Sequence, residues 1–194
     1  MIGRRKALLG LPLALGGCGL SERPYAEQRQ WPLVAYRPSA LPAPSRGLVL
    51  EVRGMRAAAG LEVRGLQSLL PDGSIRTAFY EQWAVPPPQG VEESLRLWLA
   101  QSGLFAAVVS QGSRSNADVS LESTLSALWT TPDGAVATVT VVLIDLRTPA
   151  RRVMLQRSVS GRAPVGSGGE VPAQIAAVAD VLGQIEAVLA GAAV

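Results

Sequence analysis

The strongest constraint on the fold is a long alternation of apolar and polar residues between Val119 and Trp129. One predicted face carries Val119, Leu121, Ser123, Leu125, Ala127 and Trp129, and the other carries Ser120, Glu122, Thr124 and Ser126. Successive side chains of a β-strand point to opposite faces, so this pattern predicts a half-buried strand. The turn Pro132-Asp133-Gly134 then leads into residues 136–146, which are apolar on both faces and predict a central strand.

A second hairpin is predicted before this pair of strands. Residues 66–70 and 75–83 flank the turn Pro71-Asp72-Gly73-Ser74. In that turn proline presets φ, aspartate caps its own backbone, and glycine tolerates a positive φ. Further strands are predicted at residues 48–52, 104–109 and 153–159.

Two amphipathic helices complete the predicted fold. The first covers residues 91–101, where Val91, Leu95, Trp98 and Leu99 form one apolar stripe after the stretch Pro86-Pro87-Pro88. The second follows a loop at 161–169 and covers residues 171–190, with Ile175, Val178, Leu182, Ile185 and Leu189 on its buried side. The prediction is a single α+β domain over residues 47–194, in which both helices pack on a mostly antiparallel sheet.

The N-terminus has the order of a bacterial signal peptide. A basic cluster, Arg4-Arg5-Lys6, precedes an apolar run from Ala7 to Leu15 that is too short to cross a bilayer as a helix. The segment Leu15-Gly16-Gly17-Cys18 resembles the lipobox of bacterial lipoproteins. We therefore predict that residues 1–17 are removed and that the Cys18 thiol is acylated, with chains such as palmitate holding the protein on a membrane. An ordinary secretory signal that happens to contain a cysteine is the alternative.

Residues 18–46 form the predicted tether, which is polar and interrupted by five prolines. Tyr25, Trp31 and Tyr36 are unusual in a simple linker, so part of this segment is expected to pack on the domain. Gly19 stands where an aspartate commonly retains lipoproteins at the inner membrane. By resemblance to that sorting rule, the predicted location is the periplasmic face of the outer membrane.

Composition excludes several classes of function. The net charge of +3 comes from the basic cluster before Cys18, and the remaining chain carries equal numbers of basic and acidic residues, which argues against nucleic acid as a partner. The chain has no histidine, one cysteine, and no lysine after Lys6. Those absences argue against Ser-His or Cys-His nucleophiles and against thiolate or imidazole metal sites, so no cofactor, metal or catalytic residue is predicted. The carboxylates considered for chemistry are Asp72, Glu81, Asp118, Glu122 and Asp145.

The binding candidates lie in one aromatic and proline-rich stretch, residues 79–87. Tyr80, Trp83, Pro86 and Pro87 are the residues selected there. Strand-end aromatics commonly close a core, and that is one interpretation of Tyr80 and Trp83. The other is an aromatic surface for a lipid chain or a partner protein, because Tyr and Trp combine an apolar body with a polar tip.

This stretch also carries a resemblance to a known family. A Tyr-x-x-Trp-Ala-x-Pro-Pro segment after a glycine-bearing turn, with a lipobox upstream and an amphipathic helix at the C-terminus, resembles the ABC-type transport auxiliary lipoproteins, PqiC-type proteins among them. The resemblance covers residue 48 to the C-terminus. It implies a non-catalytic periplasmic lipoprotein that works with an MCE-domain protein and an ABC permease and ATPase in the transport of lipids or hydrophobic solutes.

An alternative function is a lipoprotein that assists envelope assembly without handling lipid. Self-association into a homo-oligomer is compatible with the sequence, which contains no internal repeat or second domain.

Overall fold

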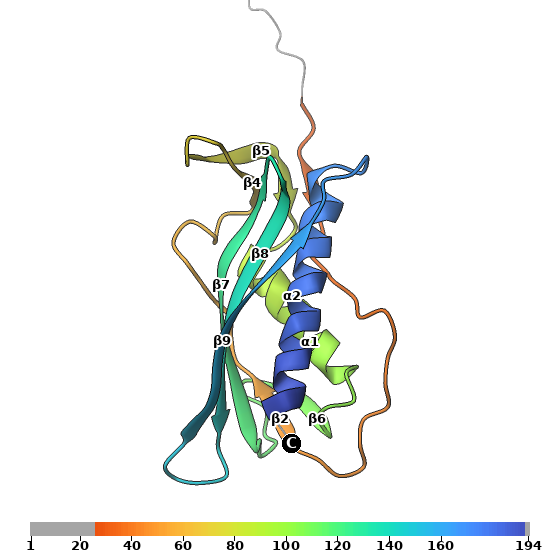
Figure 1. Cartoon of the computed structure of the whole chain (residues 1–194), viewed down its shortest axis with the longest axis vertical. Coiled ribbons are helices and arrows are strands. Elements are labelled where there is room, and N and C mark those ends of the chain that lie inside the picture. Colours follow the sequence, from red (N-terminus) through yellow and green to blue (C-terminus); the bar gives the residue numbers. More distant parts are fainter. Residues whose placement is uncertain (1–25, 193–194) are drawn as a thin grey trace, which may run out of the picture.

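The computed structural model describes residues 26–192, so the predicted signal peptide, Cys18 and Tyr25 lie outside the described residues. In this range one mixed sheet of nine strands is combined with two helices (Figure 1). The elements in chain order are β1 (Arg29–Trp31), β2 (Val49–Val52), β3 (Arg56–Ala57), β4 (Gly65–Leu69), β5 (Ile75–Trp83), α1 (Pro87–Ala100), β6 (Ala107–Ser110), β7 (Val119–Thr131), β8 (Gly134–Asp145), β9 (Arg152–Ala163) and α2 (Glu170–Ala192).

Strand β7 is the one around which the sheet is built. Along one edge it pairs antiparallel with β8 from end to end, and β8 pairs antiparallel with β9. Along its other edge β7 pairs in succession with β2, β3 and β4, always in parallel. Strand β4 continues the sheet through β5 to β1, whereas β2 continues it to β6.

The sheet is therefore mixed, and the prediction of a mostly antiparallel sheet is wrong. Both predicted hairpins are antiparallel, as expected from their turns. The parallel pairs instead join strands that are distant in the chain, β1 with β5, β2 with β6, and β7 with β2, β3 and β4. Apolar alternation identifies a strand but not its partner, and turn residues reveal only the partners that are joined by a tight turn.

A bulge in β7 changes which residues of that strand face the core. Leu125 pairs with Val139 and Ala127 pairs with Thr138, so Ser126 is an extra residue on β7. An extra residue reverses the alternation beyond it. Leu128 is consequently buried, and Trp129, which the unbroken alternation placed on the buried face, is only half-buried.

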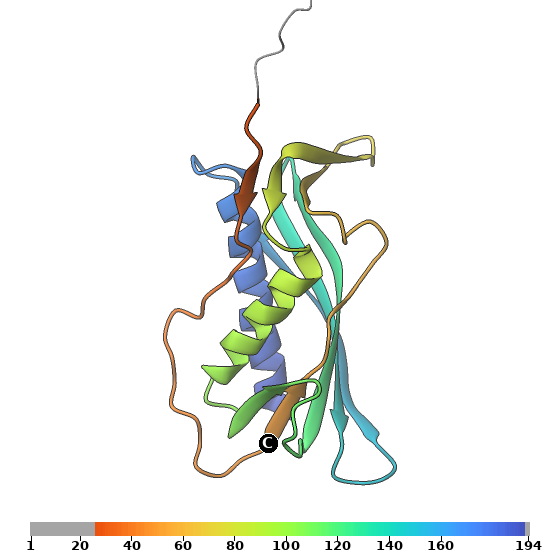
Figure 2. The ribbon, with the colours of Figure 1, turned by 180° about the vertical axis from the view of Figure 1, so that it is seen from behind.

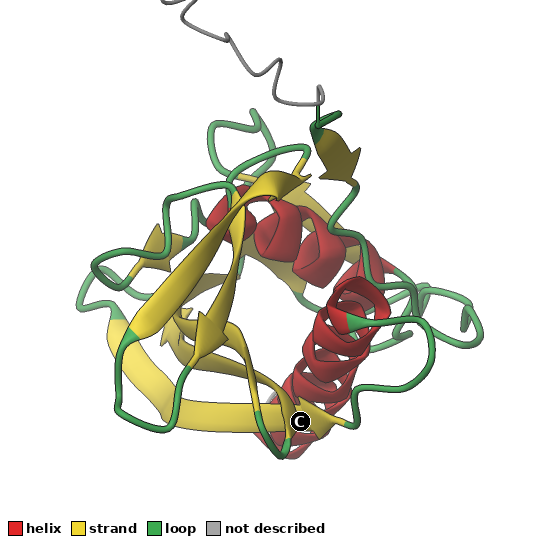
Figure 3. Cartoon of the chain, turned by 90° about the horizontal axis from the view of Figure 1, so that it is seen from above, coloured by secondary structure: helices red, strands yellow, loops and turns green. Residues whose placement is uncertain are grey.

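Both helices lie on the same side of the curved sheet (Figure 3). Helix α1 begins at Pro87, earlier than the predicted residue 91, because proline is tolerated in a first turn whose N–H groups need no helical partner. Its predicted stripe of Val91, Leu95, Trp98 and Leu99 is buried. The core lies between this face of the sheet and the two helices.

Helix α2 packs tightly along β8 and β9. Gly161 of β9 allows this approach, since a Cβ at that position would lie 2.3 Å from the carbonyl oxygen of Ala177. By length and composition alone α2 is also a candidate membrane span. Its apolar residues Val178, Leu182 and Ile185 are fully buried, however, so here it serves as a core helix.

Part of the Pro-rich segment packs on the domain, as its aromatic residues predicted. Trp31 in β1 packs against the core, whereas Tyr36 is exposed. Residues 32–42, which we call the strap, run down beside the helices toward β2 (Figure 2). Leu33 and Ala35 of the strap are buried, and the Ala35 N–H donates to Ser94 Oγ at 3.0 Å.

Candidate functional site

One end of the molecule gathers the features that could support binding. It is formed by β1, the β4–β5 hairpin, the β7–β8 turn and the β9–α2 loop, and we call it the β1 end (Figure 1). Two neighbouring pockets show that these elements are in contact, because each pocket is lined from several of them and both include Glu170. The opposite end carries β2, β6 and the β8–β9 loop (Figure 1).

An irregularity in β5 exposes two neighbouring aromatic residues at this end. Gly65 of β4 pairs with Gln82, but Gln67 pairs with Thr77, so five steps along β5 correspond to two along β4. The extra residues form a bulge in β5 that exposes Phe79 and Tyr80. Phe79 is 73% exposed and Tyr80 is 49% exposed, and their rings meet edge to face with centroids 5.1 Å apart.

The backbone of this irregular segment is nevertheless held in place. The carbonyl oxygen of Phe79 accepts hydrogen bonds from the side-chain amides of Gln28 at 3.3 Å and Gln82 at 3.2 Å. Glu81 accepts a hydrogen bond from the Trp31 indole and lies 3.7 Å from the guanidinium of Arg29. The aromatic pair therefore projects from a segment fixed to β1 on one side and to β4 on the other.

The other three selected residues lie inside or beside the core. Trp83 is 1% exposed, and its backbone exchanges two hydrogen bonds with Arg64. Pro86 precedes helix α1 and is half-buried, whereas Pro87 begins that helix and is buried. Of the four predicted candidates, Tyr80 alone presents a large free surface. The neighbouring Phe79, which is not one of the four candidates, has a larger exposed fraction.

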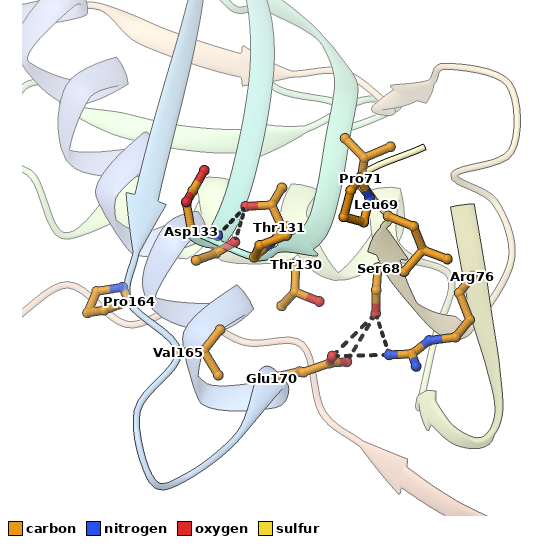
Figure 4. Close-up of a pocket in the computed structure, with 13 residues that line it drawn as sticks. Ser68, Leu69, Pro71, Arg76, Thr130, Thr131, Asp133, Pro164, Val165 and Glu170 are labelled. Carbon is orange, nitrogen blue, oxygen red and sulfur yellow. Dashed lines mark hydrogen bonds and ion pairs between the residues drawn. The ribbon is translucent and has the colours of Figure 1, made fainter. Parts of the chain in front are cut away.

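A pocket of about 450 Å³ lies between the β4–β5 hairpin, the β7–β8 turn and the first turn of α2 (Figure 4). On its floor, Ser68 donates to the carboxylate of Glu170 at 3.3 Å and accepts from the Arg76 guanidinium, also at 3.3 Å. Arg76 and Glu170 are 3.6 Å apart. These two charges neutralise one another, so the pocket offers no unpaired cation to an anionic ligand. Its remaining charged lining residue is Asp133 of the β7–β8 turn.

A second pocket, of about 380 Å³, opens between β1, β5 and the start of α2. Trp31, Leu66 and Val171 give it apolar walls, and the paired Arg29 and Glu81 lie at its edge. Sequence reasoning did not find either pocket. Both form only where strands distant in the chain meet the start of α2, and no local motif marks such a meeting.

The five carboxylates considered for catalysis all have structural partners. Asp118 accepts the Val49 N–H at 2.8 Å, and Glu122 pairs with Arg53 at 3.0 Å. Hydrogen bonds from the Ser74 hydroxyl and N–H lower the pKa of Asp72, and those from Arg147 lower the pKa of Asp145 to about 2. Asp72 and Asp145 therefore stay ionised at neutral pH. A general acid would need a raised pKa instead.

Metal binding finds no support in the part of the chain that the structure describes. Within residues 26–192 there is no cluster of three or more Asp, Glu, His or Cys side chains that could hold an ion.

The most buried ion pair among the described residues joins the strap to α2. Arg37 binds Glu186 through two hydrogen bonds of 3.0 Å, and the Trp98 indole donates to the same carboxylate at 2.7 Å, an arrangement that fastens the strap across both helices.

Comparison with protein families gives one match that covers most of the chain. The sequence model of the family described as "ABC-type transport auxiliary lipoprotein component" matches residues 33–190. The match thus begins in the strap and includes every element from β2 to most of α2. A comparison with curated protein sequences gave no match.

Solved structures share the fold at low sequence identity. An uncharacterized protein has a TM-score of 0.65 at 16% identity, over 85% of this chain and 97% of that one. Protein XCC0632 from Xanthomonas campestris, of family DUF330, has a TM-score of 0.60 at 21% identity, over 86% and 92%. The hypothetical protein CT253 from Chlamydia trachomatis has a TM-score of 0.53 at 11% identity, over 76% and 98%. These similarities establish the fold alone.

Proposed function

The chain belongs to the family of ABC-type transport auxiliary lipoprotein components, and from that premise we propose that it is a docking subunit of an MCE-type ABC transport system. In this proposal the protein is anchored at the periplasmic face of the outer membrane and carries no catalytic activity. It bridges to an MCE-domain protein and, through it, to the permease and ATPase. The cargo class is lipids or other hydrophobic solutes.

The observation that carries the proposal is the extent of the family match. It spans residues 33–190, so it includes the strap, the whole sheet after β1, and both helices rather than an isolated motif. The chemistry of the described residues is in keeping with a binding role, because the candidate carboxylates are engaged in turns and ion pairs.

The lipid anchor is the second part of the proposal. Cys18 is the acylated residue, and Gly19 after it favours sorting to the outer membrane. Several acyl chains on one residue give stable attachment, since each buried methylene contributes about 0.8 kcal/mol. The first described residue, Ala26, follows closely in the chain, so the anchor holds the domain near the membrane.

The test is co-purification from detergent-solubilised membranes. We expect the tagged protein to retain the MCE-domain protein, the permease and the ATPase, and we expect its deletion to sensitise cells to detergent. The matched control is Cys18→Ser, which should fail to incorporate a palmitate analogue and should leave the membrane fraction. Co-purification of envelope-assembly proteins in place of transport subunits would contradict the proposal and favour the alternative function.

The non-catalytic part of the proposal has its own test. Alanine at Asp72, Glu81, Asp118, Glu122 or Asp145, introduced singly, should leave the detergent barrier and partner binding intact in every variant that folds by circular dichroism. Binding spread over a surface depends on a few buried anchors and not on one exposed carboxylate. A folded variant that keeps its partners and loses all function would indicate catalysis.

A further inference from the structure

Exposed apolar side chains concentrate at the β1 end. Among the described residues, eight large apolar side chains are exposed, and four of them belong to elements of this end: Ile75, Phe79 and Tyr80 on β5 and Val165 in the β9–α2 loop. The other four are dispersed over the strap, a loop before β4 and the start of β9. Phe79 and Tyr80 contact each other, and exposed apolar side chains gathered at one end of a molecule commonly indicate a partner or a membrane.

The path of the chain indicates which of these it is. The described residues begin at Ala26, and β1 follows at Arg29, paired with Glu81–Trp83 immediately beyond the aromatic pair. The eight steps from Cys18 to Ala26 span at most about 28 Å, even in a fully extended chain. Helix α2 separates the two ends of the molecule by its 23 residues, a length of about 35 Å. The stretch from Cys18 to Ala26 is therefore too short to reach past the domain and bring the opposite end to the bilayer.

We propose that the β1 end rests on the bilayer that holds the Cys18 anchor, with Phe79 and Tyr80 in the boundary between headgroups and acyl chains. This inference rests on the lipid anchor proposed above. It assigns the aromatic pair to lipid and leaves the opposite end free for a protein that approaches from the other membrane.

The chemistry of the pair suits that boundary. Aromatic side chains with an apolar ring and, in tyrosine, a polar tip are enriched where water meets acyl chains. A backbone carbonyl entering that region needs hydrogen-bond partners, and the Phe79 carbonyl has two, from Gln28 and Gln82. The bulge thus presents two rings to the membrane without an unpaired carbonyl at their base.

The charges at this end predict how the contact behaves. Arg29 and Arg76 each lie within 4 Å of a carboxylate, Glu81 and Glu170 respectively. The exposed Arg162 lines a pocket together with Asp133 of the β7–β8 turn, so this end carries no excess of positive charge for anionic headgroups. Asp72 stays ionised at the hairpin tip and resists insertion there. We therefore expect the membrane contact to be driven by the burial of apolar side chains. Phe79 should insert more deeply than Ile75, and binding should be nearly independent of the content of anionic lipid.

The experiment uses the full acylated protein in vesicles of phosphatidylcholine, with and without phosphatidylglycerol. Acylation consumes the thiol of Cys18, so Phe79→Cys, Tyr80→Cys and Val153→Cys each provide one free thiol for an environment-sensitive fluorophore. Val153 is the matched control because it is 54% exposed and lies at the start of β9, at the opposite end. Circular dichroism checks that each variant folds. Two positions on β5 are labelled so that the test remains possible if one of these variants does not fold.

We expect lipids that carry a nitroxide to quench the probes at 79 and 80 several-fold more than the probe at 153, in both vesicle types. Equal quenching at the two ends, in protein that floats with the vesicles, overturns the inference and leaves the anchor intact. Protein that fails to float or lacks acyl chains by mass spectrometry refutes the anchor itself. Probes at 79 and 80 that stay in water, together with a Phe79→Ser/Tyr80→Ser variant that no longer retains the MCE-domain protein, would assign the surface to that protein instead.

Discussion

The two halves of β5 differ sharply, although they belong to one strand and one aromatic stretch of sequence. The outer half, Ile75–Tyr80, exposes Phe79 and Tyr80 to solvent at the end of the molecule. The inner half, Glu81–Trp83, pairs with β1 and buries Trp83 completely among the strands and helices. Only two residues lie between the surface Tyr80 and the core Trp83, so proximity in the sequence did not make these aromatics one site.

The difference arises from the pairing of β5 with β4. The register slips between Gly65 and Gln67, and the additional residues of β5 bulge away from the sheet. Gly65 makes this possible, because a Cβ there would lie 2.3 Å from the carbonyl oxygen of Ala78. A small residue on one strand thus determines which aromatics of its neighbour reach the surface.

Truncation of the inner aromatic should have the largest effect. We expect Trp83→Ala to lower the free energy of unfolding by about 3–5 kcal/mol, because it removes a fully buried ring. For a domain of this size the melting temperature would fall by roughly 6–20 °C. Thermal denaturation followed by circular dichroism measures the change. An unchanged midpoint with lost partner binding would place Trp83 on a binding surface and remove the distinction between the two halves.

A change at the glycine tests the origin of the distinction. Gly65→Ala forces its Cβ against the β5 backbone, and we expect a cost of about 1–3 kcal/mol, typical of overpacking. Gly166→Ala is the control, since nothing lies within 4 Å of the added Cβ and its stability should stay within about 0.5 kcal/mol of wild type. Equal melting temperatures for both variants would show that β5 does not press on Gly65.

Much of this architecture could be predicted from local sequence signals. Alternation located β7, turn residues located both hairpins, and helical periodicity located α1 and α2. Every predicted stripe residue of the two helices is buried except Ile175, which is half-buried. These signals work because they arise within one element or between neighbours in the chain. The bulge at Ser126 shows their limit, since one inserted residue moved Trp129 off the buried face without any local mark.

The parallel pairs and the β1 end could not be predicted in the same way. Strand β3 has two residues and β1 has three, too few for alternation to be recognised, and both pair in parallel with strands far along the chain. The two aromatic candidates, Tyr80 and Trp83, ended up in different environments for the same reason. Only the register between β4 and β5 decides that Tyr80 is exposed and Trp83 buried, and register is a property of two strands together.

Acid should weaken the ion pair that attaches the strap to α2. The strap follows β1, which pairs with the inner half of β5, so this tests what holds β1 in place. Hydrogen bonds from Arg37 and Trp98 hold the pKa of Glu186 below its ordinary value. A folded-state pKa below the unfolded one gives stability that is present above the ordinary carboxyl pKa, about 4.3, and is lost as pH falls through the folded value. Melting temperatures measured from neutral pH downward should therefore fall less steeply in Glu186→Gln than in the wild type.

Asp72 and Asp145 provide the background for that comparison. Their pKa values are also lowered, so both proteins should lose some stability in acid, and the informative quantity is the difference between the two curves. Parallel curves would mean that Glu186 keeps the same pKa in the unfolded chain and that its ion pair adds no pH-dependent stability.

Truncation of the outer aromatics should have the smallest effect on folding. Phe79→Ala and Tyr80→Ala remove rings that contact mainly each other and solvent, so we expect each to stay within about 0.5 kcal/mol of the wild-type free energy of unfolding. Urea denaturation resolves such a difference better than a thermal midpoint, because the slope also shows whether the exposed area changes. The contrast with Trp83→Ala, measured on the same strand, is the sharpest form of the comparison. A loss at Tyr80 as large as that at Trp83 would mean that the outer half is covered in the native protein, and it would withdraw the free surface on which membrane contact depends.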